Sequence, residues 1–226
     1  MTGSTVVFLG PSLSPRLVPR HPALRYLPPV RRGDLPALLG RSPLPARIAV
    51  IDGEFGQSLS VSVTELRDAL RGGVEVWGAS SMGALRAAEC SVLGMRGVGW
   101  IFDQYAGGVL EADDEVALLF DPDGFRPLTV PLVNVRWALR LAVPAGAVPA
   151  SVAPDVLAAA RALHFEERTW PALCRLPGDP RPVSAARALA CFAGAHPTAC
   201  DRKALDALLL LSTLTRLAEE VPDAAA

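Results

Sequence analysis

Three short apolar runs in the first half of the chain constrain its fold most strongly. The segments TVVFLG (5–10), RIAVID (47–52) and VEVWG (74–78) are rich in β-branched residues, and each stops at Gly or Asp. Apolar runs of this length that end at turn residues are typical of buried parallel strands. Between the second and third runs, SVSVTELRDALRGG has a helix-forming second half and a Gly-Gly stop. Residues 47–78 are therefore predicted to form a βαβ unit.

The segments around these strands have a different character. Residues 11–46 are dense in proline and arginine, so we expect mainly loop there, running over the surface. After residue 90 the pattern becomes helical, with helices predicted at 97–106, 133–142, 153–170, 184–195 and 201–220. The sequence thus predicts an α/β protein. Residues 1–120 would form a small parallel sheet with flanking helices, and residues 121–226 a helical part packed on it as one compact unit.

Composition and charge exclude several classes of protein. A chain of 226 residues, half of them hydrophobic, can bury a full core. Its net charge of −1 gives no electrostatic footprint for nucleic acid or for a membrane surface. The run LDALLLLSTL is too short to span a bilayer, and MTGSTVVFLG lacks the basic region of a targeting signal. We therefore expect a cytoplasmic protein that binds neither nucleic acid nor membrane.

The cysteines and histidines give no metal-binding pattern. The four cysteines include no C-x-x-C pair, and the chain has only three histidines. A zinc site of known spacing cannot be assembled from them, so no metal is expected and the thiols are expected to be reduced.

The basic residues are distributed very unevenly between the two types. Of the 22 basic residues, 21 are Arg, and Lys203 is the single Lys. A GC-rich coding sequence explains the Arg surplus at surface positions, where either residue serves. Arg cannot give up its proton in a protein, whereas a desolvated Lys can become a neutral base. Lys203 is therefore either a chance survivor or a residue with a chemical role.

Two serines stand where the third strand joins the following helix, in VEVWGASSMGALRAAE. This turn, with Ser80 and Ser81, lies at the carboxyl end of a parallel strand, where open α/β sheets bind ligands. The first amides of the helix, those of Met82, Gly83 and Ala84, are expected to be free and to face a group above Ser81. Such geometry suits a nucleophile with an oxyanion hole, although the strict G-x-S-x-G pattern is absent. The alternative is that one serine simply caps the helix.

Seven segments occur in a characteristic order: VVFLGPSL, YLPPVRRGDL, IDGEFGQS, WGASSMGALRAAE, GMRGVGWIFDQYAGGVLEADDEVAL, VNVRWAL and DRKALDALLLL. In them the chain resembles the TfuA-like family, over nearly its whole length and most densely between residues 48 and 118. The resemblance implies a partner of YcaO-domain enzymes, which replace a backbone amide oxygen of a ribosomal peptide or protein with sulfur. It further implies that the protein hydrolyses the C-terminal thiocarboxylate of a ThiS-like sulfur-carrier protein and so delivers sulfide to YcaO.

The resemblance also implies a Ser-Lys catalytic pair. The serine of the family's SMGALRAAE motif is Ser81. Similar sequences often read His-Lys-Glu in the helix after the DG-x-F-x-Q motif, but this chain has Thr64 in place of that lysine. The other family lysine belongs to a D-x-K-x-x-D-A segment, here DRKALDA, which contains Lys203. We therefore expect Ser81 as nucleophile and Lys203 as base, with no cofactor, since ATP would belong to the YcaO partner.

Other polar residues are candidates for the same site, each with a structural alternative. Asp52 and Gly53, which end the second strand, either line the cleft or make the turn. Gln57 has the same two alternatives. Arg86, one helical turn after the serines, either holds a carboxylate or caps the sheet edge. Two residues of VNVRWAL either bind the carrier tail or serve as buried polar contacts. In chain order these candidates are Asp52, Gly53, Gln57, Arg86, Asn134 and Arg136.

A second class of function is a non-catalytic adaptor, which would bind the YcaO enzyme and enhance the binding of its peptide substrate. Thr64 favours the adaptor, whereas Ser81 and Lys203 favour the enzyme. The segment EADDEVA (111–117) is expected to be the acidic start of a helix, or else a docking face for a basic partner.

Overall fold

The computed structural model describes residues 4–56, 58–175 and 180–220. The chain divides into two compact units. The first comprises Met1–Glu111 and Asp206–Ala226, and the second comprises Ala112–Leu205.

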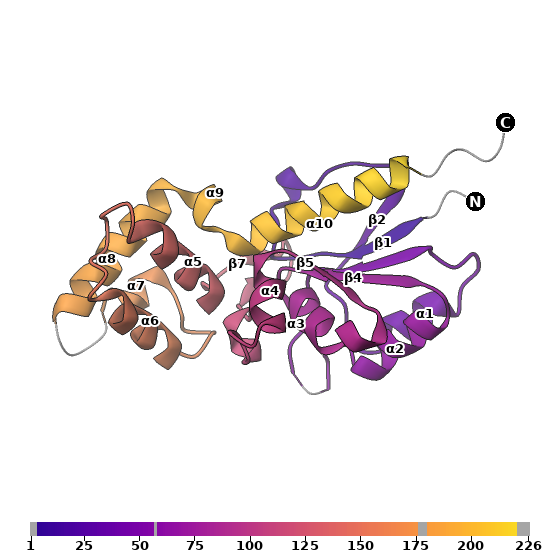
Figure 1. Ribbon diagram of the computed structural model, residues 1–226, viewed down its shortest axis with the longest axis horizontal. Helices are drawn as coiled ribbons and strands as arrows, with labels where there is room; N and C mark the ends of the chain where they lie inside the picture. Colours follow the sequence, from indigo (N-terminus) through magenta and orange to yellow (C-terminus); the bar gives the residue numbers. More distant parts are fainter. Residues whose placement is uncertain (1–3, 57, 176–179, 221–226) are drawn as a thin grey trace. The chain divides into compact units, whose positions relative to one another are not determined.

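A five-stranded parallel sheet in the order β2-β1-β3-β4-β5 forms the centre of the first unit (Figure 1). The central strands are almost entirely buried and apolar, because helices lie on both sides of the sheet. The sheet confirms the α/β prediction and the three predicted strands. In chain order the strands are β1 (Thr5–Phe8), β2 (Leu24–Leu27), β3 (Arg47–Val50), β4 (Glu75–Ala79) and β5 (Arg96–Val98).

Helices cover the two faces of this sheet unequally. Helices α1, α2 and α3 lie on one face and α10 on the other (Figure 1). Ser62 and Glu65 form a capping box that starts α2, as expected for the helix of a βαβ unit. The helices of this unit are α1 (Asp34–Leu39), α2 (Val63–Arg71), α3 (Met82–Glu89), α4 (Trp100–Ala106) and, from Asp206 onward, α10 (Arg202–Glu219).

Two strands and one helix of the first unit were not expected from the sequence. The prediction of mainly loop over residues 11–46 is wrong where β2 and α1 form, with a 3-10 turn, η1 (Pro15–Leu17), ahead of them. The helix predicted at 97–106 begins only at Trp100, because β5 occupies residues 96–98. Both strands lie at the edges of the sheet, where a strand is short and partly exposed and so lacks a long apolar run.

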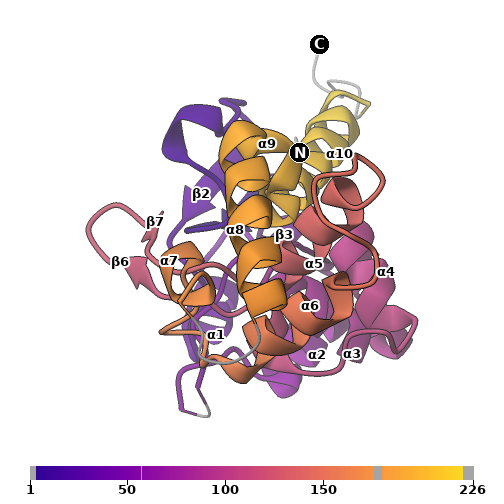
Figure 2. The same cartoon turned by 90° about the vertical axis from the view of Figure 1, so that its left-hand side faces the viewer.

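The second unit is mainly helical, as predicted for the C-terminal half. Helices α5, α6 and α8 lie side by side (Figure 2) and bury a core that includes Leu132, Leu139 and Leu189. The described part of this unit also contains a small antiparallel hairpin of two-residue strands, which was not predicted. The elements of the second unit that precede α10 are η3 (Asp113–Glu115), β6 (Phe120–Asp121), β7 (Arg126–Pro127), α5 (Leu132–Ala142), α6 (Ala153–Ala162), α7 (Trp170–Leu173), α8 (Pro180–Ala195) and α9 (Pro197–Cys200).

The helix predicted at 153–170 ends early, at Ala162, because a buried arginine caps it. Arg168 has no exposed surface, and its guanidinium donates to the carbonyl oxygens of Ala160 and Leu163 at 2.9 and 3.0 Å. These are carbonyls that the end of a helix leaves without an internal partner. The same guanidinium pairs with Asp114, which compensates its charge.

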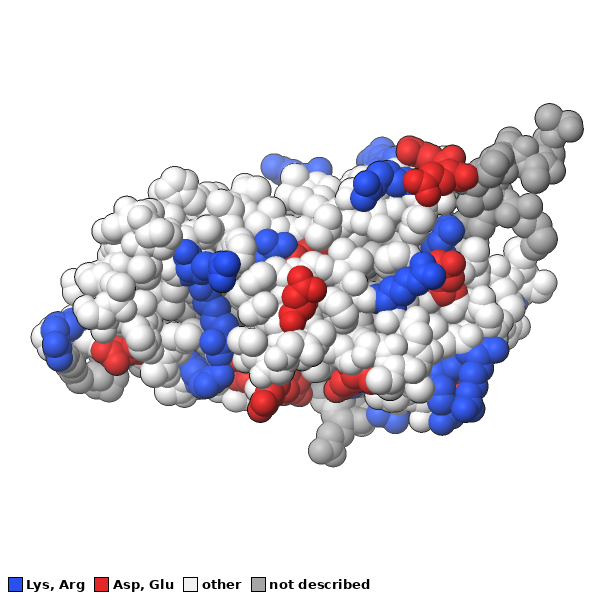
Figure 3. All heavy atoms as spheres, in the orientation of Figure 1, with Lys and Arg blue, Asp and Glu red and all other residues white. Residues whose placement is uncertain are grey.

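Charged side chains of both signs are scattered over the face drawn in Figure 3, in places side by side. Such a mixed surface is what a net charge of −1 leads one to expect.

The four thiols should differ strongly in reactivity. Cys191 is exposed, whereas Cys90 and Cys200 are buried, and burial raises the pKa of both buried thiols, which lowers their thiolate fraction. We expect iodoacetamide at neutral pH to alkylate Cys191 at least about ten times faster than Cys90. Peptide mass spectrometry over time measures both rates, and equal rates would contradict the buried position of Cys90.

Candidate active site

The turn between β4 and α3 has an unusual backbone at its first serine. β4 ends at Ala79 and α3 begins at Met82, so only two residues connect them. Ser80 adopts a left-handed conformation with φ of 67°, which costs a non-glycine residue about 1–2 kcal/mol. Ser81 follows at the N-cap position. The chain therefore changes direction sharply here, as it does in turns that present a nucleophile.

This turn is possible because two glycines let backbone meet backbone. A Cβ atom added to Gly83 would overlap the carbonyl oxygen of Val50, and one added to Gly78 would overlap the carbonyl oxygen of Gly83. No L side chain fits at either position without a shift of the backbone. The first turn of α3 therefore lies directly against the ends of β3 and β4.

Asp52 binds the segments that follow the strands next to this turn. Its Oδ2 accepts hydrogen bonds from the backbone N–H groups of Gly10 and Ser12 at 2.9 and 3.0 Å, and its Oδ1 accepts from the Ser12 hydroxyl at 2.6 Å. The Ser80 hydroxyl in turn donates to Ser12 Oγ at 2.9 Å. Asp52, Ser12 and Ser80 are all buried. One buried chain of hydrogen bonds thus joins the segments that follow β1, β3 and β4.

The two serines of the turn differ in how their hydroxyls are used. Ser80 is fully buried and bound to Ser12, whereas the Ser81 hydroxyl makes no hydrogen bond to any residue that the structure describes. Ser81 stands at the N-cap but does not cap the helix with its side chain. The simple capping alternative is therefore not realised at Ser81.

The expectation of three free amides at the start of α3 is wrong for two of them. The Gly83 N–H donates to the carbonyl oxygen of Ile51, and the Ala84 N–H donates to that of Ser81. Within the described residues, the Met82 N–H alone of these three makes no hydrogen bond. An anion above Ser81 would meet this amide and the positive end of the helix.

Other predicted residues of the first unit have structural contacts. A Cβ atom on Gly53 would lie 2.8 Å from Met82 Cγ, so this glycine lets the turn after β3 pack against α3. Arg86 donates to the carbonyl oxygen of Val61 and pairs with Glu89 at 2.5 Å. Thr64, at the position where similar sequences have a lysine, is exposed in the first turn of α2. Gln57 lies outside the described residues.

Lys203 occupies a buried position in the second unit. Its side chain is 2% exposed, and its Nζ donates to the carbonyl oxygen of Val116 at 2.9 Å. Asn134 contacts the start of α10, since its side chain donates to Asp201 at 3.0 Å and accepts from the Lys203 N–H at 3.2 Å. Lys203 is thus not a solvated surface lysine, and Asn134 acts as a polar contact inside the unit.

Arg136 and a glutamate of the EADDEVA segment form a bidentate ion pair. Arg136 donates to both carboxylate oxygens of Glu115 at 2.8 and 2.6 Å, and Arg161 adds a third contact at 3.1 Å. Glu115 is only 1% exposed, so this part of the acidic segment is not a docking face. The expected acidic helix start is only a single 3-10 turn, and its glutamate points inward to arginines.

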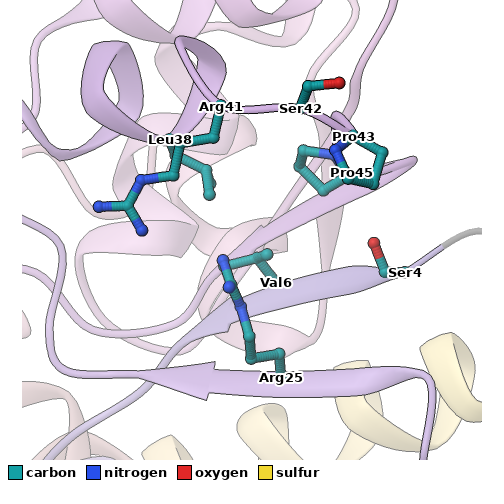
Figure 4. A pocket seen from close by; sticks show the side chains of 8 residues that line it. All are labelled: Ser4, Val6, Arg25, Leu38, Arg41, Ser42, Pro43 and Pro45. Carbon is teal, nitrogen blue, oxygen red and sulfur yellow. The ribbon is translucent and has the colours of Figure 1, made fainter.

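A pocket of about 270 Å³ opens in the first unit, away from the serine turn (Figure 4). Arg25 and Arg41 extend into it beside Val6 and Leu38. It is lined by residues just before β1 and β3, such as Ser4 and Pro45, so it lies at the amino ends of the strands. The serine turn follows the carboxyl end of β4 and does not line this pocket.

A family comparison establishes what kind of protein this is. The model of the family described as TfuA-like protein matches residues 52–169, which is more than half of the chain. The chain belongs to the TfuA-like family. The match begins at Asp52 and contains the serine turn, whereas Lys203 lies beyond its end. The family is associated with YcaO-type thioamidation, so membership supports an involvement of this protein in thioamidation.

The comparison with curated proteins adds nothing to the family. No curated protein matches the chain. No helix in the described ranges is long and apolar enough to cross a membrane. Among the residues that the structure describes, no group of three or more His, Cys, Asp or Glu side chains could hold a metal ion.

Ser12 is the residue of this site that sequence reasoning missed. It lies in GPSL, directly after the first predicted strand, at the same sheet edge as Asp52 and Ser80. A small polar residue at the end of a strand that neighbours the candidate site is a signal that could have found it.

The glycine contact leads to a stability prediction. Gly83→Ala should lower the free energy of unfolding by about 3 kcal/mol, since the methyl group must displace the β3 backbone. Gly194→Ala is a matched control, because Gly194 lies in α8 with no atom within 4 Å of an added Cβ, so it should stabilise by about 0.5–1 kcal/mol. Urea unfolding measures both, and an unchanged midpoint for Gly83→Ala would contradict the close approach.

Proposed function

We propose that this TfuA-like protein hydrolyses the C-terminal thiocarboxylate of a ThiS-like sulfur carrier and delivers sulfide to a YcaO enzyme. The observation that supports this proposal best is the state of Ser81. Its hydroxyl is uncommitted among the described residues and stands at the start of α3, at the carboxyl edge of a parallel sheet. An uncommitted hydroxyl at such a turn is suited to act as a nucleophile.

The reaction would proceed through an acyl-serine. Ser81 Oγ attacks the thiocarboxylate carbon, and its proton passes to the neutral amine of Lys203. The C–S bond then breaks, and the sulfur leaves as hydrogen sulfide ion after taking that proton. Water attacks the resulting ester, which releases the carrier with an ordinary C-terminal carboxylate and restores the Ser81 hydroxyl. The step requires no oxidant or reductant.

The start of α3 would stabilise the negative charge that develops on the carbonyl oxygen. The Met82 N–H is the amide available for this in the present structure, together with the positive end of the helix dipole. The Gly83 amide would have to leave the Ile51 carbonyl before it could contribute a second hydrogen bond.

The proposed mechanism requires Lys203 to enter the reaction as a neutral amine, since only that form can accept the Ser81 proton. Lys203 is almost entirely buried. The mechanism requires its amine to reach the Ser81 hydroxyl during the reaction. A crystal structure with bound carrier would measure the distance between Lys203 Nζ and Ser81 Oγ.

Loss of the nucleophile should abolish the reaction. Ser81→Ala should reduce sulfide release from a thiocarboxylated carrier by a factor on the order of 10³ or more, as removal of a nucleophilic serine does elsewhere. Ser80→Ala should retain measurable activity, and Ser91→Ala, which changes an exposed serine, should retain full activity. A sulfide assay with purified carrier measures all three. Normal release by a folded Ser81→Ala variant would exclude Ser81 as the nucleophile.

Lys203→Arg should separate base chemistry from charge. Arg keeps the positive charge but cannot accept the serine proton, so we expect hydrolysis to fall by about 100-fold or more. Hydrolysis by Lys203→Met should fall as far. This variant keeps most of the side-chain volume without the amine, so it controls for packing. Both variants should still bind YcaO in a pull-down, and circular dichroism would verify their folding. If Lys203→Arg hydrolyses the carrier normally, Lys203 is not the base.

The adaptor alternative has its own outcome in these experiments. It expects wild-type protein to bind YcaO and to enhance binding of the peptide without releasing sulfide from the carrier.

A further inference from the structure

The buried chain Ser80–Ser12–Asp52 connects the serine turn to the rest of the sheet edge. Ser80 Oγ donates to Ser12 Oγ at 2.9 Å, and Ser12 Oγ donates to Asp52 Oδ1 at 2.6 Å. The three residues are far apart in the sequence: Ser80 lies 68 positions after Ser12, and Asp52 lies 40 positions after Ser12. Each is at most 2% exposed, so water competes little for these bonds.

Asp52 is placed to anchor this chain. Both of its carboxylate oxygens already accept hydrogen bonds, Oδ2 from the N–H groups of Gly10 and Ser12 and Oδ1 from the Ser12 hydroxyl. An acceptor held by three donors is a fixed point to which the loop after β1 is tied.

The chain ends at the residue whose backbone is least favourable. Ser80 has a positive φ, which a serine adopts only when surrounding contacts hold it. Ser81 is the next residue, so the conformation of Ser80 sets the direction in which the Ser81 side chain leaves the backbone. The bond from Ser80 to Ser12 is the side-chain contact that holds Ser80 in place.

We propose that Ser12 and Asp52 are positioning residues for Ser81. They hold Ser80 in its left-handed conformation, which directs the Ser81 hydroxyl out of the turn and leaves it without a competing partner. This inference rests on the proposed function in one respect, namely that Ser81 is the reacting group.

A serine-directed fluorophosphonate tests the inference without the carrier. Ser81 Oγ forms a bond to phosphorus, the P–F bond breaks, fluoride leaves and the hydroxyl proton passes to solvent. Peptide mass spectrometry follows labelling of Ser81 over time. Ser12→Ala and Ser80→Ala should each slow this labelling about tenfold, because each removes the bond between the two hydroxyls.

The double variant distinguishes one shared bond from two separate effects. If Ser12 and Ser80 act through the same hydrogen bond, the variant that carries both changes should label within about twofold of either single variant. Ser60→Ala is the matched control, since Ser60 is also buried and its hydroxyl binds elsewhere, to the Gly56 carbonyl oxygen. It should label at the wild-type rate. Ser12→Thr, which keeps the hydroxyl, should restore labelling to within about threefold.

Hydrolysis of a thiocarboxylated carrier gives a second readout. Because positioning affects the reacting group and not the binding of the carrier, Ser12→Ala should lower kcat about tenfold and leave KM unchanged. Thermal denaturation would establish that every variant is folded at the assay temperature.

The outcomes separate this inference from the proposed function. Labelling of Ser81 that follows the expected pattern, with no hydrolysis of the carrier by wild type, would overturn the proposed function and support the positioning role. Wild-type labelling rates for Ser12→Ala, additive losses in the double variant, equal slowing by Ser60→Ala or the absence of Ser81 labelling in wild type would each overturn the positioning role.

Discussion

The contact on which the site depends is backbone against backbone, where α3 starts against the ends of β3 and β4. Gly78 and Gly83 have no side chain, and this absence lets the first turn of the helix approach the two strands closely. The approach leaves room for only two residues between β4 and α3, which forces Ser80 into a left-handed conformation. The hydrogen bonds from Ser80 through Ser12 to Asp52 then hold that conformation.

Both units bury charged side chains whose hydrogen-bonding groups are bound by several partners. In the first unit, Asp52 accepts from two backbone amides and a hydroxyl. In the second, Glu115 accepts from two arginines, and Arg168 caps α6 from a fully buried position. A buried carboxylate or guanidinium is tolerated only when its hydrogen-bonding capacity is used. These groups therefore fix loops that the apolar core alone would leave free to move.

Local patterns were sufficient for the long elements and insufficient for the site. The apolar runs of β1, β3 and β4 and the periodicity of α2, α5, α8 and α10 identify these elements from the sequence, because each depends on neighbouring residues. β2 and β5 are edge strands with little apolar signal. Ser12 could not be connected with Ser80 by local pattern, since their contact depends on which strands become neighbours. The Gly83 amide was expected to be free for the same reason, but it donates to the carbonyl oxygen of Ile51, directly after β3.

The burial of Lys203 also determines what amine chemistry the protein can undergo. It is the single lysine of the sequence and is 2% exposed, so the surface of the described chain presents no lysine amine. Activated acyl groups, such as thioesters and acyl phosphates, modify proteins mainly through accessible amines. Because its one lysine amine lies inside the fold, the described chain offers such groups no accessible lysine to acylate. The same property makes lysine-directed crosslinkers and dyes poor reagents for this chain, whereas the exposed thiol of Cys191 offers a selective point of attachment.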